Sequence, residues 1–425
     1  MVGMLSTYLR SACVSLLATI FGTLAAHAEA RDPIRVLTMS DPFAIVMMDH
    51  IDAFEALIGQ PLELELVGYE ALRQQLLLNA FEEHSRFDLI AVDAAWAQEV
   101  AAAELVLPLD SLLTKQNIET KTYLQPALKS AIVNKVTIGL PVQPHAELLF
   151  YDHHHLSQQN LAPPVTTDDV LNVATQVHGQ REGLSGICWN ARHGAPLGQT
   201  MLHLLAAFGG TPLDETGQPT LDTMAMRSAI HYAKNLLDVS PPDILDMAWD
   251  ERIEAFATGR CALTYGWTGR SLLLERSGLD LESGRIGVAP APHAPGAKPV
   301  SPLGTWLLSI PSNLSDDRTE SAFDALLKLT SIDANRLYVE QGVGTLLHTS
   351  LIDDPSVATR NPAVAMMGQL EKQGALRGWM RPGIDAFQGL TEILGSQVHG
   401  VLTGVRSIDD AAAGSQASFA ALLSE

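Results

Sequence analysis

The chain has few cysteines and lacks the short motifs of common enzyme and metal sites. Only three of its 425 residues are cysteine, with no CxxC pair and no Cys/His metal spacing. No Walker A loop, GxSxG elbow or HExxH sequence occurs. The run 153–155 is three histidines, but consecutive helical residues point about 100° apart and cannot all meet one ion. We therefore expect neither a metal nor a cofactor.

Positive charge is also scarce. The chain has 27 basic residues against 48 acidic ones, a net charge of −21. A protein this acidic repels nucleic acid and anionic lipid, so neither is expected as a partner. Most of the carboxylates are expected on solvated helix faces, so the charge does not identify a ligand.

Long apolar runs are confined to the beginning of the chain. The segment SACVSLLATIFGTLAA follows a basic residue and precedes small residues at 26–30, the pattern of a secretory signal peptide over 1–28. Cys13 lies before the apolar core, which argues against lipid attachment there. No later stretch reaches the roughly 18 consecutive apolar residues of a membrane span. We expect a cleaved, soluble, exported protein.

After cleavage two cysteines remain, Cys188 and Cys261. In an oxidising compartment they could form a disulfide. Two thiols buried apart fit the sequence equally well, so the pairing stays open.

The mature chain begins with a β-α-β-α-β pattern. Strand-like runs occur at 34–40, 62–68 and 87–93, with helical apolar spacing between them. This order predicts the α/β class, a mostly parallel sheet flanked by helices, with ligands at the carboxyl ends of strands. Asp41 and Asp93 follow two such ends, and Trp96 is close to the second. Asp93 as a helix cap and Trp96 as a core residue are equally consistent.

Two proline-rich segments, 136–152 and 287–311, interrupt this pattern and are predicted to be crossovers between two lobes. The mature length also favours two lobes, since single cores seldom grow beyond about 250–300 residues.

Several aromatic residues lie beside small ones. The segment AFATGRCALTYGWTGR at 255–270 places Trp267 between two glycines, and Trp306 follows Gly304-Thr305. A sugar ring has an apolar face of C–H groups and a rim of hydroxyls, so it suits an aromatic platform with polar groups around it. Trp189 and Tyr265 are further candidates, although a tryptophan is more often a core residue.

Segments spread over nearly the whole mature chain resemble the extracellular solute-binding proteins of ABC importers, in particular the sugar-binding family that includes maltose-binding protein. They are FDLIAVDAAWAQEVAAAELVLPLD, IGLPVQPHAELLFYDHHHLSQQNLAPPVTTDDVL, LLAAFGG, AFATGRCALTYGWTG, GVAPAPHAPGAKPVSPLGTWLLSIP and RPGIDAFQGLTEILGSQVHGVLTGVRSIDDA. Their order and spacing carry the resemblance, since none is a catalytic signature.

The resemblance implies a hinged, two-lobe periplasmic binding protein fold of type II. It assigns 31–142 plus 293–345 to lobe 1, and 143–292 plus 346–425 to lobe 2 with the C-terminal helices. The hinge is expected at 141–147 and 288–296, and the ligand between the lobes.

The same resemblance suggests residue roles. Trp267 would stack on the ligand, with Gly304 and Trp306 on the opposite wall. Gln143 and His145 would lie near the cleft, and Arg381 would make a C-terminal contact.

The implied function is capture of a sugar, oligosaccharide or polyol by a periplasmic monomer, which delivers it to an ABC permease in the inner membrane. One alternative keeps the fold and changes the ligand to a polyamine or another cation, because Asp41 and Asp93 are acidic. A second is a secreted glycan-acting enzyme, although no carboxylate pair can be placed from the sequence.

Overall fold

The computed structural model describes residues 32–279, 281–378 and 382–424. Its strands are β1 Ile34–Met39, β2 Leu62–Val67, β3 Leu89–Asp93, β4 Ile132–Val133, β5 Val136–Thr137, β6 Leu140–Asp152, β7 Ser185–Cys188, β8 Cys261–Trp267, β9 Ile286–Ala289, β10 Ser301–Ser309 and β11 Leu376–Arg377.

The α-helices are α1 Pro42–Asp49, α2 Ile51–Ile58, α3 Tyr69–Asn79, α4 Ala97–Ala102, α5 Asp110–Lys115, α6 Gln125–Ser130, α7 His153–Gln158, α8 Thr167–Val177, α9 Ala195–Ala207, α10 Met224–Leu237, α11 Trp249–Ala257, α12 Ser271–Arg276, α13 Asp316–Leu329, α14 Ile332–Glu340, α15 Pro355–Arg360, α16 Pro362–Lys372, α17 Phe387–Leu402 and α18 Ile408–Leu422. Short 3₁₀ turns include η1 Ala94–Trp96 and η4 Thr268–Arg270. Within the described ranges, no helix has the length and apolar character that crossing a membrane requires.

One mixed sheet runs through the molecule in the order β2-β1-β3-β10-β6-β8-β7. β1 is parallel to β2 and β3, and β7 is parallel to β8. β10 is antiparallel to β3 and β6, and β6 is antiparallel to β8 and β9. The predicted α/β class is confirmed, and the sheet is mixed because each of the two central strands, β10 and β6, is antiparallel to both of its neighbours in that order.

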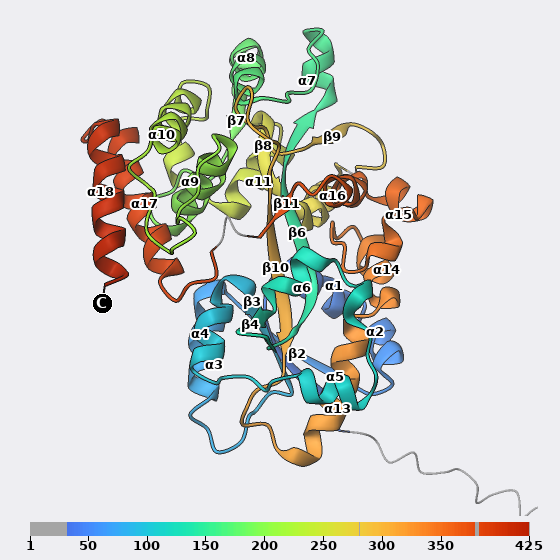
Figure 1. Cartoon of the computed structure of the whole chain (residues 1–425). Helices are drawn as coiled ribbons and strands as arrows, with labels where there is room; N and C mark the ends of the chain where they lie inside the picture. Colours follow the sequence, from blue (N-terminus) through green and yellow to red (C-terminus); the bar gives the residue numbers. More distant parts are fainter. Residues whose placement is uncertain (1–31, 280, 379–381, 425) are drawn as a thin grey trace, which may run out of the picture.

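The central strands β6 and β10 pair in the middle of the molecule, from which β6 extends toward α7 and β10 toward α13 (Figure 1). The first half of β6 pairs with β10 and its second half pairs with β8 and β9. All thirteen residues of β6 are buried. The predicted boundary at 142/143 falls inside this strand, and the division into two lobes at the stated residues stays a prediction.

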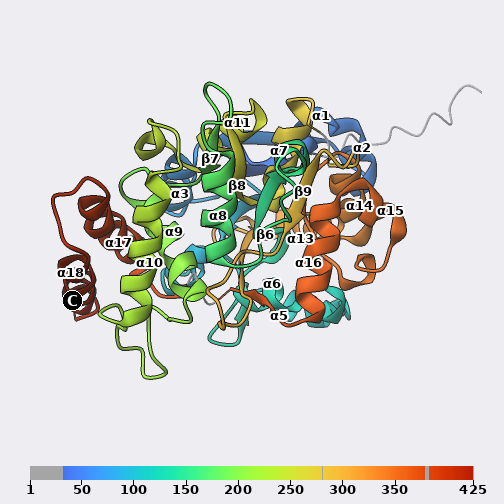
Figure 2. The same ribbon diagram turned by 90° about the horizontal axis from the view of Figure 1, so that it is seen from above.

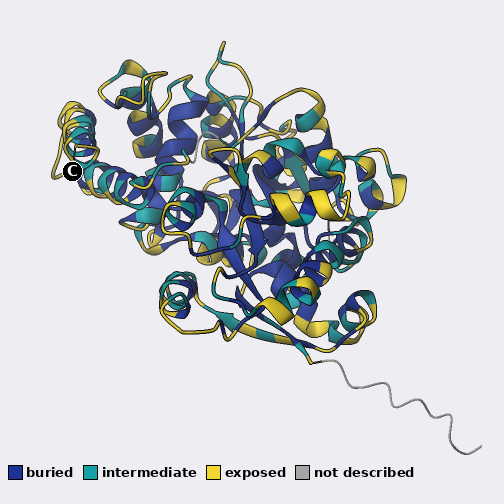
Figure 3. Cartoon of the chain, turned by 60° about the horizontal axis from the view of Figure 1, so that its bottom comes forward, coloured by how far each residue is buried: buried dark blue, intermediate teal, exposed yellow. Residues whose placement is uncertain are grey.

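Helices cover both groups of strands. α1, α2, α3 and α13 surround β1–β3, whereas α8, α9, α10 and α11 surround β7 and β8 (Figure 1). Seen from above, α17 and α18 lie at one end beside α9 and α10, and α14–α16 lie at the other (Figure 2). The strands and the inward helix faces are buried, and exposed residues lie on the outer faces (Figure 3).

Side-chain caps define the beginning of two helices. Asp152 caps α7, accepting a hydrogen bond from the His154 amide, and Ser331 caps α14 through the Ala334 amide. The segment between helix α11 and strand β8 turns at Gly259, whose φ of 73° suits glycine. Local side-chain chemistry therefore sets these boundaries.

The structure resolves the open question about the cysteines. Cys188 of β7 and Cys261 of β8 form a disulfide, with Cα atoms 5.8 Å apart. The bond joins neighbouring parallel strands and closes a loop with a sequence separation of 73.

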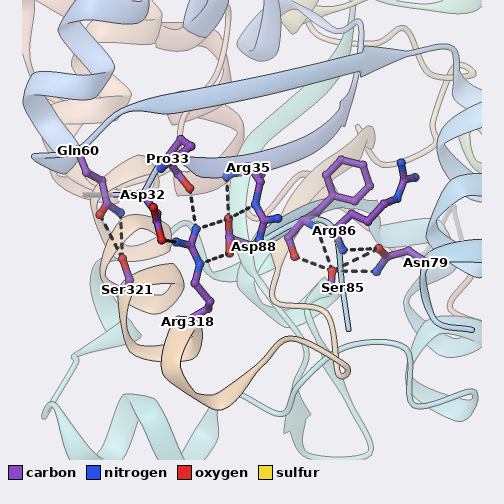
Figure 4. A network of polar contacts seen from close by, with 11 residues as sticks. Asp32, Pro33, Arg35, Gln60, Asn79, Ser85, Arg86, Asp88, Arg318 and Ser321 are labelled. Atoms are coloured by element: carbon purple, nitrogen blue, oxygen red, sulfur yellow. Dashed lines mark hydrogen bonds and ion pairs between the residues drawn. The ribbon is translucent and has the colours of Figure 1, made fainter. Parts of the chain in front are cut away.

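A buried carboxylate anchors the beginning of the described chain (Figure 4). Asp88, with no exposed side-chain surface, accepts bonds from the Arg35 backbone at 2.8 Å and from Arg318 Nε at 2.9 Å and Nη2 at 2.8 Å. Burial alone would raise the pKa of Asp88, but the bonds from Arg318 and Arg35 outweigh it and lower that pKa. The network joins β1 and the segment before β3 to α13.

Candidate functional site

A cavity lies where the carboxyl ends of β1, β3 and β8 meet the central strands. It contains about 560 Å³ of space, counting the part open to solvent. The lining residues are Met39, Asp41, Tyr69, Asp93, Gln143, His145, Gln199, Trp249, Trp267, Gly269, Arg270 and Trp306.

Four aromatic side chains form much of the wall. Tyr69 lies between Trp249 and Trp306, with ring centroids 6.4 Å and 6.1 Å away. Trp267, at the end of β8, is partly exposed, and its ring meets the His145 ring edge-on at 4.9 Å. These rings offer flat apolar surface to a ligand from more than one side.

A polar centre joins three segments that are distant in sequence. Asp41, before α1, accepts bonds from Gln143 Nε2 at 2.5 Å and from Arg270 Nη1 at 2.8 Å. Gln143 in turn accepts a bond from the Phe43 amide at 2.8 Å through Oε1. Both carboxylate oxygens of Asp41 are thereby engaged within the protein, and the three side chains hold one another in fixed orientations.

Arg270 is held by a second carboxylate. Its Nε lies 2.9 Å from Asp250 Oδ1 at the start of α11. Burial by itself would lower the pKa of Arg270, but Asp41 and Asp250 outweigh that effect and raise it. Arg270 is therefore a permanent cation balanced by its neighbours.

Asp93 both caps a turn and lines the cavity. Its Oδ1 accepts a bond from the Ala95 amide at 3.0 Å, and its Oδ2 accepts a bond from the Tyr69 hydroxyl at 2.9 Å. The two interpretations of Asp93 from the sequence are thus compatible, because one carboxylate has two oxygens.

The structure brings six of the predicted residues to the cavity. They are Asp41, Asp93, Gln143, His145, Trp267 and Trp306. Their contact with a ligand stays a prediction. Arg381 lies outside the described residues.

Four other predicted residues are not among those that line the cavity. Trp189 is wholly buried and donates a hydrogen bond to Ser240 Oγ at 2.9 Å. Tyr265 is 1% exposed, and its hydroxyl lies 2.8 Å from that of Tyr232. Both side chains lie in the core, and their contact with a ligand stays a prediction.

Trp96 and Gly304 are likewise not among the lining residues. Trp96 is 2% exposed and packs behind the wall, with its ring 4.7 Å from Tyr69 and 6.0 Å from Trp306. Gly304 is buried in β10, opposite His145 in the strand register. Trp96 therefore supports the cavity from its outer side.

Sequence reasoning missed half of the lining. The missed residues are Met39, Tyr69, Gln199, Trp249, Gly269 and Arg270. Tyr69 follows the carboxyl end of β2, so the rule that selected Asp93 would have found it. Trp249 begins helix α11, and Gln199 lies within the largely apolar helix α9, so neither had a local signal.

No metal cluster of three or more His, Cys, Asp or Glu side chains occurs among the described residues. The histidine run at 153–155 begins α7. His153 and His154 are exposed, and His155 is partly exposed.

Comparisons with known proteins agree with this geometry. The family model of bacterial extracellular solute-binding proteins matches residues 42–327. A probable ABC transporter-binding protein of Deinococcus radiodurans is 22% identical over 292 residues, covering 67% of this chain and 69% of the relative.

Two solved structures share the fold. An ABC transporter solute-binding protein from Agrobacterium radiobacter K84, in complex with ribitol, matches with a TM-score of 0.83 and 21% identity, covering 92% of this chain and 100% of the other. Maltose-bound MalE3 of T. maritima matches with a TM-score of 0.79 and 22% identity, covering 91% and 100%. The predicted two-lobe, type II binding-protein fold is confirmed. The family match extends over well over half of the chain, which therefore belongs to the bacterial extracellular solute-binding protein family.

Proposed function

We propose that this protein captures a neutral sugar or polyol in the cavity around Trp267 and delivers it to an ABC permease. The observation that carries the proposal is the combination of aromatic wall and polar centre in one cavity. The rings suit the C–H faces of a carbohydrate, and the polar side chains suit its hydroxyls. The ribitol and maltose complexes of two proteins with this fold support the same ligand class.

The neutrality of the ligand follows from the pairing of charges in the site. Asp41 is bonded to Arg270 and Gln143, and Asp93 is bonded to Tyr69 and a backbone amide. A cationic ligand would have to compete with these internal partners, at a desolvation cost for each group displaced. A neutral hydroxyl can share the same carboxylates without breaking the ion pair.

In this proposal Asp41, Asp93, Gln143 and His145 bind hydroxyls, and Trp267 and Trp306 contact apolar faces. The lobes 31–142 plus 293–345 and 143–292 plus 346–425 close on the ligand through a hinge at 141–147, within β6, and at 288–296, which begins at the end of β9. Closure is the state that the permease recognises, since ligand binding shifts the population toward it.

The protein acts as a periplasmic monomer after removal of 1–28, and its partner permease lies in the inner membrane. It releases its ligand chemically unchanged. The family is one of solute-binding proteins, and the two cavity carboxylates, Asp41 and Asp93, are already bonded within the protein.

Calorimetry with purified mature protein tests the proposal against ribitol, D-mannitol, D-glucose, maltose and spermidine. We expect at least one neutral compound to bind, with little dependence of its affinity on salt. Strongly salt-dependent binding of spermidine alone would replace the proposal with the cation alternative. If chromatography showed that the protein converts a carbohydrate into a product, the result would instead support the enzyme alternative.

Replacing Trp267 by alanine should weaken binding of that compound by about 1 to 3 kcal/mol, because the stacking surface is lost. Phe81→Ala is the control, since Phe81 is 88% exposed and does not line the cavity. Equal affinities of Trp267→Ala and wild type would remove Trp267 from the site.

A further inference from the structure

A buried ion pair and a buried histidine lie on the elements that carry the cavity residues. Glu147 of β6 is 5% exposed, Arg252 of α11 is 1% exposed and His203 of α9 is 3% exposed. Glu147 Oε1 accepts a bond from Arg252 Nη1 at 2.7 Å, and Glu147 Oε2 lies 3.6 Å from His203 Nδ1. We refer to these three residues as the Glu147 cluster.

Each member of the cluster belongs to an element that also supplies a cavity residue. Gln143, His145 and Glu147 are every second residue of β6, so their side chains lie on the same face of the strand. In α11, Arg252 follows Trp249 by three residues, and in α9, His203 follows Gln199 by four. These spacings place each pair on one side of its helix.

The cluster also lies beside the position of Trp267. Glu147 is opposite Trp267 in the register of β6 and β8. The His203 ring meets the Tyr265 ring edge-on at 5.3 Å, and Tyr265 lies on the same face of β8 as Trp267. One carboxylate thus connects the strand and the two helices that surround the aromatic wall.

Stability alone does not explain these buried charges. Removing an ion pair from water costs several kcal/mol per ion, and apolar residues of similar volume are often as stable or more stable. The guanidinium Nε and Nη2 of Arg252 and the Nε2 of His203 are buried without a hydrogen-bond partner among the described residues. Charges retained at such a cost fit a requirement for one specific arrangement.

We propose that Glu147 is a positioning residue for the cavity. Through Arg252 and His203 it holds β6, α11 and α9 at the separation that places His145, Trp249 and Gln199 around the ligand. The ligand part of this inference rests on the function proposed above.

The test compares Glu147→Gln with an apolar double variant, Glu147→Leu/Arg252→Met. The single variant leaves Arg252 as an unpaired buried charge. We therefore expect Glu147→Gln to lower the melting temperature of the protein. It should also lower the affinity for ribitol or for another panel compound that binds wild type. The double variant should recover the melting temperature while its affinity stays at least tenfold below wild type. Recovery of both would reduce Glu147 to a stabilising residue and overturn the proposal.

Glu275→Gln is the matched control. Glu275 is a partly buried carboxylate that accepts two bonds of 2.7 Å from Arg360, and neither residue lines the cavity. Its substitution should lower stability without changing affinity. An affinity loss in this variant equal to that of Glu147→Gln would assign both effects to general destabilisation.

Amide hydrogen exchange gives a readout that needs no ligand. Glu147→Gln should accelerate exchange together in 143–147, 199–203 and 249–252, whereas Glu275→Gln should not. Acceleration in β6 alone, or in none of these segments, would contradict the proposal. If wild type bound no panel compound, the proposed function would fail while exchange would still decide whether Glu147 couples the three elements.

Discussion

At the scale of single residues, the two glycines beside Trp267 have a packing role. A Cβ on Gly266 would lie 2.9 Å from Ile253 Cδ1 and 3.0 Å from a Phe150 ring carbon. A Cβ on Gly269 would lie 3.0 Å from Gln143 Nε2. The glycines therefore let β8 and η4 approach the hydrophobic core and the polar centre closely, and Trp267 reaches the cavity from between them.

Replacing Gly269 by alanine should disturb the polar centre. The added methyl would push the Gln143 amide, which holds Asp41, so we expect ligand affinity to fall by about 1 to 2 kcal/mol, the cost of moderate overpacking. Calorimetry with the compound that binds wild type measures the change. Gly68→Ala is the control, because a Cβ there meets nothing within 4 Å; a loss of affinity in the control alone would contradict this account.

At the scale of elements, the strands around the site are secured by local and covalent means. β8 pairs with β6 on one side and β7 on the other, and it ends at Trp267. The disulfide between Cys188 and Cys261 fixes β7 against the beginning of β8, at the end of that strand remote from the cavity. The bond should therefore affect stability more than ligand recognition.

The double variant Cys188→Ala/Cys261→Ala should lose about 2 to 4 kcal/mol of unfolding free energy, because the closed loop of 73 residues no longer restricts the unfolded chain. Urea denaturation measures the loss. A reducing agent should lower the unfolding free energy of wild type and leave that of the double variant unchanged. A double variant as stable as the oxidised wild type would show that the bond contributes nothing.

At the scale of the whole molecule, long-range ion pairs join segments that are far apart in sequence. The Asp88 network connects residues separated by 53 and 230 positions (Figure 4). Since the pKa of Asp88 is lowered in the folded protein, its contribution is present above its unfolded pKa near 3.9 and is lost as the pH falls through the folded value.

Asp88→Asn should therefore reduce the unfolding free energy at pH 7 by about 2 to 3 kcal/mol, because two arginines lose their buried partner. The difference from wild type should shrink below about pH 4, where Asp88 becomes protonated in the unfolded chain and then in the native protein. Urea titrations across pH 2.5–7 measure it. The control Asp324→Asn removes only a surface pair with Lys328 and should lower the unfolding free energy by less than about 0.5 kcal/mol. If the loss of unfolding free energy in Asp88→Asn did not change with pH, protonation of Asp88 would not be linked to stability.

The sequence by itself determined the secondary structure, the α/β class and several cavity residues. Apolar periodicity and caps such as Ser331 act within a few residues, so they can be recognised locally. Asp41, Asp93 and Trp267 were found because strand ends and glycine-flanked aromatics have a local pattern. Chain length and the two proline-rich segments indicated two lobes, and the family resemblance supplied the type II fold and the position of Gln143 near the cleft.

Only the tertiary structure decided which aromatic residues line the cavity and which are core. Trp189 is enclosed beside Ser240, whereas Trp249 lines the cavity with its ring 6.4 Å from that of Tyr69. The partnership of Asp41 with Arg270 spans 229 positions, and that of Glu147 with Arg252 spans 105. Such contacts depend on how strands and helices are brought together, and no local pattern encodes them.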